Sequence, residues 1–206
     1  GPVHIPLNII CLAAVNDLSY FSAGLKAEGV IAGKSRRAEL RLDSITAAYR
    51  DHYCGPMHLV ANISGDDIDA TIVSRDRLLS FEADCSVNVG SEVKTIEASL
   101  DIYKARPFSL GLINDYSDYS LSASAGANIE FSSADDISGY LTLSDLDFID
   151  DDPTTPDLKI NSISIEVLPL DEAPGISVKS DFCNAYINGN YRFSTLVGDI
   201  SDIVAS

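Results

Sequence analysis

The sequence predicts an all-β domain built as an antiparallel meander. Three observations predict this class: strict alternation of apolar and polar residues, turn residues that recur about every ten residues, and little helical periodicity. Segment 79–89 has an apolar residue at every odd position and a polar one at every even position, and segment 121–131 repeats the pattern with one glycine. A period of two is typical of strands in a sheet with one buried face, which is common in antiparallel sheets.

The other strands follow from the same alternation, taken in chain order. Before segment 79–89 it marks 3–11, 25–31, 37–43, 57–63 and 68–72, and after it 96–102, 121–131, 137–148, 158–167, 175–182 and 183–193. Residues 64–67, Ser-Gly-Asp-Asp, predict a hairpin turn, and the short link at 91–92 makes its flanking strands antiparallel neighbours. The apolar phase changes between Ile160 and Ile163, so we expect a bulge there.

Two segments break the alternation. Pro107 suits a first helical turn, which predicts a short helix or helical turn over 108–113. Residues 194–204 have apolar residues at helical spacing behind Ser194, a candidate N-cap, and predict a short C-terminal helix.

About a dozen strands with a single apolar face must cover that face. They can fold into a β-sandwich, close as a barrel, or curl into a trough that holds an apolar ligand. Small residues such as Ala123, Ala125, Ala127 and Ala185 leave volume that large side chains would fill, and so favour the trough. A closed β-sandwich is the alternative.

Composition limits the organisation and the partners. The chain has 206 residues, 46% of them hydrophobic, which suits one globular domain. Gly1-Pro2 is typical of a protease-cleavage scar, so we expect residues 3–206 to be a single domain cut from a longer protein. The formal net charge of -17 disfavours nucleic acid and anionic headgroup surfaces as partners. No apolar run approaches the roughly 20 residues of a membrane-spanning helix.

The three histidines lie in no recognisable catalytic motif. His4, His52 and His58 form no zinc-binding pair and adjoin no nucleophile elbow. His52, Cys54 and His58 are a conceivable metal cluster, although their place before a Gly-Pro turn favours ordinary loop residues. We therefore expect no enzyme, no catalytic residue, no metal and no cofactor.

The acidic run and the cysteines favour structural roles. The carboxylates at 145–152 lack the glycine and distal glutamate of a calcium-binding EF-hand loop, which favours a solvated acidic turn; they are Asp145, Asp147, Asp150, Asp151 and Asp152. The four cysteines contain no C-x-x-C pair. Cys85 and Cys183 lie on apolar phases, which predicts buried free thiols or a core disulfide, with the pairing undetermined.

Three segments carry a resemblance to a known family. Residues 176–196 (ISVKSDFCNAYINGNYRFSTL), 105–112 (ARPFSLGL) continuing to 119–123, and 137–148 (ISGYLTLSDLDF) resemble the TamB translocation and assembly family of the AsmA-like superfamily. The resemblance implies a U-shaped "β-taco" trough with an apolar interior. It also implies an inner-membrane-anchored periplasmic protein that moves phospholipid to the outer membrane or assembles outer-membrane proteins.

The partners implied are phospholipid acyl chains and either an Omp85-type barrel or outer-membrane protein clients. Alternation alone nominates the residues that line the groove: Phe81, Cys85, Val87, Ile96, Leu100, Leu121, Ala125, Ile129, Phe131, Ile187, Tyr191 and Phe193. A rival reading is a surface adhesin or carbohydrate-binding β-sandwich, with Tyr103, Tyr140 and Tyr186 as contact residues.

Overall fold

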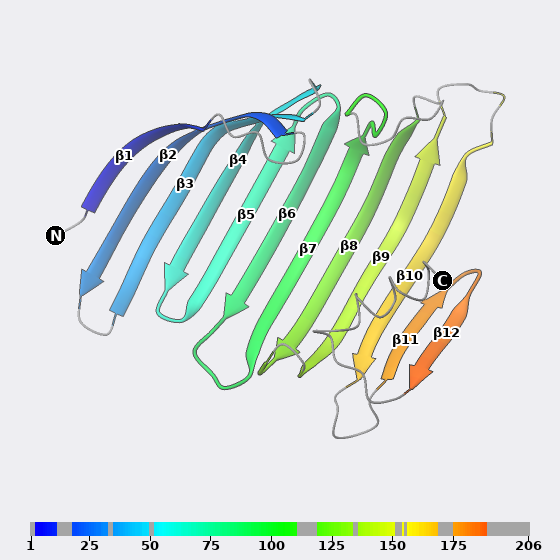
Figure 1. Ribbon diagram of the computed structural model, residues 1–206. Helices are drawn as coiled ribbons and strands as arrows, with labels where there is room; N and C mark the ends of the chain where they lie inside the picture. The colour runs from blue at the N-terminus through cyan, green and yellow to red at the C-terminus, as the bar shows by residue number, and fades with distance from the viewer. Residues whose placement is uncertain are drawn as a thin grey trace.

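The described residues form one open antiparallel sheet of twelve strands (Figure 1). The computed structural model describes residues 3–11, 18–32, 35–49, 52–110, 119–133, 136–150, 154, 156–168 and 175–188. The strands are β1 (Val3–Cys11), β2 (Leu18–Ala32), β3 (Ser35–Tyr49), β4 (His52–Ser64), β5 (Asp67–Arg75), β6 (Leu79–Asn88), β7 (Lys94–Ala105), β8 (Ser120–Phe131), β9 (Ile137–Ile149), β10 (Leu158–Leu168), β11 (Gly175–Ser180) and β12 (Asn184–Asn188). Each pairs with the next strand in the chain, from β1 at one edge to β12 at the other. The predicted all-β antiparallel meander is confirmed.

Short turns between consecutive strands produce this meander. β4 and β5 are joined by Gly65 and Asp66 alone. Gly65 has a φ of 66°, a left-handed conformation that glycine adopts without steric cost. The Val89 N–H donates to the Asp66 carbonyl oxygen at 3.0 Å and so ties the next hairpin to this turn. The predicted turn at 64–67 and the predicted link between β6 and β7 are both confirmed.

The pairing register gives the sheet one apolar and one polar face, because directly paired residues point to the same side. One apolar row runs across β4 to β12 through Ala61, Ala70, Cys85, Ala98, Ala127, Leu141, Ile165, Val178 and Ala185. A neighbouring row on the other face runs through Asn62, Asp69, Ser86, Glu97, Asn128, Tyr140, Glu166, Ser177 and Tyr186. The two faces therefore differ in polarity over nine consecutive strands.

Little of the apolar face is buried. Among the side chains that the structure describes, the buried apolar ones are Ile45, Ala105, Leu110 and Ala123. They lie toward one end of the strands, near the turn between β5 and β6 and the C-terminal end of β7 (top of Figure 1). Away from that end most side chains of the apolar face are half-buried, and Leu141 of β9 is 46% exposed.

The closed β-sandwich alternative is wrong for the described residues. The described strands form a single open sheet in which each strand contacts its neighbours in the series, and no second layer of described strands faces it (Figure 1). The helical segment over 108–113 is a single turn in its described part, where the Leu110 N–H donates to the Arg106 carbonyl oxygen at 2.9 Å. Residues 111–113 and the predicted helix at 194–204 lie outside the described residues.

The irregularity predicted between Ile160 and Ile163 is present at Asn161 of β10. Ile160 pairs with Leu146 and Ile163 with Leu143, whereas Asn161 is left out of the pairing with β9, and its N–H donates to Asp181 Oδ2 at 2.9 Å. β9 has a matching irregularity at Asp145, where φ is 52° and the register against β8 shifts between Ser122 and Ser124. Both strands are therefore distorted at the same point, and the apolar phase changes in both.

The prediction for the cysteines is only partly right. Cys85 is half-buried on the apolar face, but Cys183 is exposed, and both are free thiols. Cys183 lies in the turn before β12, where its carbonyl oxygen accepts hydrogen bonds from the Ser180 N–H at 2.8 Å and the Ser180 hydroxyl at 3.1 Å. The alternation extends one residue farther than the strand, and so placed Cys183 wrongly on the apolar face.

Candidate functional site

The apolar face contains a hollow of about 360 Å³ that extends across β4 to β9. Its apolar lining consists of Leu59, Ala70, Ile72, Ala83, Cys85, Ala98, Leu100, Ala125, Ala127 and Leu141. Six strands are spanned by five inter-strand spacings, so the hollow is roughly 24 Å long across the strands. It therefore runs along the sheet and not along any one strand.

Differences in side-chain size between rows account for the hollow. The row Ala70, Cys85, Ala98 and Ala127 lacks the volume of leucine or isoleucine. The row on one side is bulkier throughout, with Ile68, Val87, Ile96 and Ile129. The row on the other side alternates larger and smaller residues: Leu59, Ile72, Ala83, Leu100, Ala125 and Leu143. The small row forms a floor between these walls.

The predicted lining residues lie on this face wherever the structure describes them. Cys85, Leu100 and Ala125 line the hollow. Val87, Ile96 and Ile129 form a wall row that continues through Gly139, Val167 and Ile176 to Ile187 on β12.

The remaining nominees lie at the two ends of the strands or outside the description. Phe81 and Leu121 are near the buried end, where Leu121 pairs with Ala105. Phe131 is at the opposite end, with the Lys94 ammonium nitrogen 5.7 Å from its ring centroid. Tyr191 and Phe193 are outside the described residues.

The sequence did not nominate Leu59, Ala98 and Leu141 as lining residues, and it indicated Ala127 only as one of the small residues that favour a trough. Alternation assigns each of them to the apolar face, but only the cross-strand register brings them together. The two-residue turn between β4 and β5 fixes that register locally and was the available signal.

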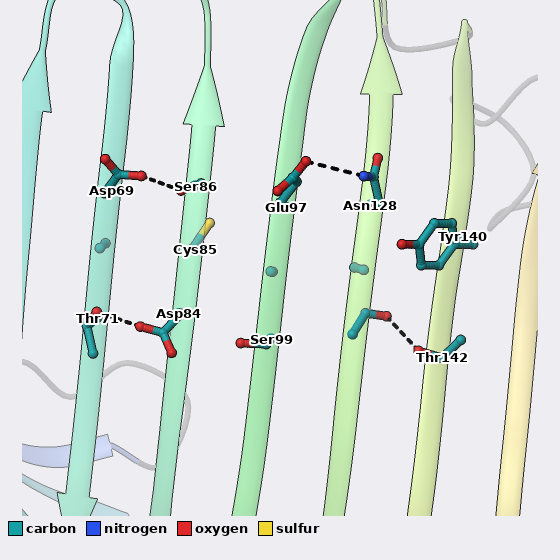
Figure 2. Close-up of a pocket in the computed structure, with 14 residues that line it drawn as sticks. Asp69, Thr71, Asp84, Cys85, Ser86, Glu97, Ser99, Asn128, Tyr140 and Thr142 are labelled. Atoms are coloured by element: carbon teal, nitrogen blue, oxygen red, sulfur yellow. Dashed lines mark hydrogen bonds between the residues drawn. The ribbon is translucent and has the colours of Figure 1, made fainter.

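The polar face has its own hollow of about 710 Å³ over β5 to β9, drawn in Figure 2. Cross-strand hydrogen bonds order its carboxylates. The Thr71 hydroxyl donates to Asp84 Oδ1 at 2.6 Å, and the Ser86 hydroxyl donates to Asp69 Oδ1 (Figure 2). Across β7 and β8, Asn128 Nδ2 donates to Glu97 Oε1 at 3.5 Å and completes the same arrangement. The donors here are neutral groups.

The nucleophile and metal candidates do not assemble into a reactive site in the described part of the chain. Burial raises the pKa of the Cys54 thiol, and the negative charge of Asp76 raises it further, so the thiol stays protonated near neutrality. His58 Nδ1 lies 3.3 Å from Asp43 Oδ1, on an exposed surface. The side chain of His52 is not described. No group of three His, Cys, Asp or Glu side chains among the described residues could hold a metal ion.

In the described part of the acidic run, Asp147 forms an ion pair with Lys159. Lys159 Nζ lies 3.0 Å from Asp147 Oδ2, and this hydrogen bond and charge raise the pKa of the exposed lysine. Asp151 and Asp152 lie outside the described residues.

Comparisons with known proteins do not assign the chain to a family. No family model, no curated protein and no solved structure matches it. The described residues contain no helix that is long and apolar enough to cross a bilayer.

Proposed function

We propose that this domain is a conduit segment that binds phospholipid acyl chains on its apolar face. The observation that carries the proposal is the apolar row that continues from β4 to β12 with little burial. Each methylene group of a lipid tail left in water costs about 0.8 kcal/mol. A continuous apolar path with a polar outer face would remove that cost along the length of the sheet.

The shape of the hollow favours acyl chains as ligands over flat apolar partners. Its floor of alanine and cysteine side chains lies between rows that contain the larger side chains of isoleucine, leucine and valine. A long, thin and flexible apolar ligand fits such a shape. Contiguous exposed apolar surface of this kind marks a binding surface in soluble proteins.

The finer fold that we propose is a U-shaped trough. Curling of the open sheet around the hollow would shield the apolar face from water and leave the polar face outside. The meander permits this change because it requires only added twist and bend between neighbouring strands, with no change of pairing.

The cellular setting that we propose rests on the resemblance to the TamB family. On this resemblance, the domain would lie in the periplasm of a Gram-negative envelope, within an inner-membrane-anchored protein. Phospholipid transport between the two membranes is then the process served, with assembly of outer-membrane proteins through an Omp85-type barrel as the associated role. The net charge of -17 suits a ligand held by its tails, because anionic headgroups would be repelled.

The test is lipid binding by the purified chain. Native mass spectrometry and organic extraction should recover phospholipid, and protein stripped of lipid should take it up again from vesicles of the zwitterionic lipids phosphatidylethanolamine and phosphatidylcholine. Glycerophosphoethanolamine, which has the headgroup without tails, should not compete. Protein that carries no lipid and takes up none from the vesicles would contradict the proposal.

A further inference from the structure

A glycine, Gly126, forms part of the floor of the hollow on the polar face. Gly126 of β8 lies in the row between Ser99 and Thr142 and contributes no side chain there. A Cβ built on Gly126 would lie 3.3 Å from Thr142 Oγ1, so a larger residue would fill this floor. The Thr142 hydroxyl instead donates to the Gly126 carbonyl oxygen at 3.3 Å. The result is an open depression of about 710 Å³, within the size range of small-ligand sites.

An aromatic ring stands at the rim of this depression. Tyr140 of β9 is 51% exposed and is paired with Asn128. Figure 2 shows its ring projecting from β9 toward β8, with the hydroxyl end toward the hollow. An exposed ring beside hydrogen-bonding groups offers an apolar face to C–H groups and a polar edge to hydroxyl groups.

The carboxylates in the hollow keep most of their hydrogen-bonding capacity. Asp69, Asp84 and Glu97 accept hydrogen bonds from the neutral donors Ser86, Thr71 and Asn128, respectively. An ionised carboxylate has about four acceptor positions, so each retains room for hydroxyl donors from a ligand. The cross-strand bonds hold these side chains in place before binding, which lowers the entropy that binding costs.

We propose that this hollow is a second binding site, for a neutral glycan chain. Sugar hydroxyls would donate to Glu97 and Asp84 and accept from Asn128 and Ser99, while a pyranose face stacks on Tyr140. Charge excludes phosphorylated, sulfated and uronic-acid chains, because the lining contains acidic residues and no basic one. The site lies on the face opposite the apolar hollow and does not depend on lipid binding.

The experiment is a screen of the full chain on an array of neutral oligosaccharides, followed by calorimetric titration with the hexasaccharides that bind. We expect at least one neutral hexasaccharide to bind. Tyr140→Ala should weaken the affinity for this hexasaccharide about tenfold, equivalent to about 1.4 kcal/mol. Tyr140→Phe should retain most of the affinity of the parent, because the ring is kept. Gly126→Asn should abolish binding by filling the floor.

Two comparisons make the result decisive. Tyr103→Ala is the matched control: Tyr103 is also exposed, but it does not line the hollow, and the Arg75 guanidinium lies 5.3 Å from its ring centroid. Its removal should leave the affinity unchanged. Hexalysine and a hexamer of galacturonic acid test whether the charge of a ligand alone determines its binding to the hollow.

Three outcomes would overturn the glycan site. These are no binding of any neutral glycan, equal binding by the parent and a folded Gly126→Asn variant, or binding of hexalysine without binding of sugars. The last would identify a basic peptide surface instead. None of them bears on phospholipid retention, which is measured separately on the same samples.

Discussion

Replacing Ala125 by arginine tests whether the apolar face is open. Ala125 lines the apolar hollow, paired with Leu100 of β7 and Leu143 of β9. If the face is open or holds mobile lipid, the guanidinium can extend along its apolar stem to water, and the substitution costs about 0.5 kcal/mol. A domain of this size loses about 2–4 °C of Tm per kcal/mol, so we expect a fall of about 1–2 °C.

If another protein layer covers the apolar face, Ala125→Arg should cost more stability. An unpaired charge buried there costs about 3–5 kcal/mol, which corresponds to a fall in Tm of roughly 6–20 °C. The two cases are therefore separated by several degrees, well within the resolution of a thermal melt followed by circular dichroism.

Ser124→Arg is the matched control for Ala125→Arg. Ser124 is the preceding residue on β8 and points to the polar face, where its hydroxyl donates to Asp101 Oδ1 at 2.6 Å. An arginine there meets a carboxylate and water, so Tm and lipid content should match the parent. Ala125→Arg should stay folded and lose most of its bound phospholipid. A fall of 6 °C or more in Ala125→Arg alone would refute the open face, and undiminished lipid would refute the groove.

Three further predictions concern stability and reactivity. Gly139→Ala should cost about 2 kcal/mol or more, because Gly139 has a φ of 136° and a Cβ there would lie 2.1 Å from the Asn128 carbonyl oxygen; an unchanged urea midpoint would contradict this. Ser74→Ala should cost about 1 kcal/mol, since this fully buried hydroxyl donates to the Leu79 carbonyl oxygen at 2.6 Å; chemical denaturation measures it, and no loss would contradict the role given to the bond. Cys54 should react with iodoacetamide at pH 7.5 far more slowly in the folded than in the urea-unfolded protein, because its pKa is raised on folding; equal rates by peptide mass spectrometry would count against it. The thiol reaction should accelerate as the pH rises toward that pKa.

Much of the fold could be predicted because alternation depends only on local sequence. The odd phase of 79–89 places Cys85 on the apolar face, and that of 121–131 places Ala125 there, whatever their partners are. The two-residue turn at Gly65 also fixes which residues of β4 and β5 are opposite each other. These features need no long-range information.

The site itself could be predicted only in part, because it depends on register between strands joined by longer links. Ala98 lies between Cys85 and Ala127 only after the β6–β7 and β7–β8 pairings are set. Asp145 adopts a positive φ without a glycine to signal it, so the sequence predicted the irregularity in β10 but not the matching one in β9. The hollow around Gly126 also depends on Ser99 of β7 and Thr142 of β9. The sequence pattern does not indicate that these three residues are adjacent in the sheet.

Site-specific photocrosslinking is the measurement that tests the lipid conduit most directly. A photoreactive amino acid would be placed at Ala98, on the floor of the apolar hollow, or at the next residue, Ser99, on the polar face. Irradiation of Gram-negative cells that produce each variant should crosslink phospholipid from position 98 and none from position 99. Crosslinks from position 98 only to other segments of protein, or equal lipid labelling from both positions, would contradict the conduit.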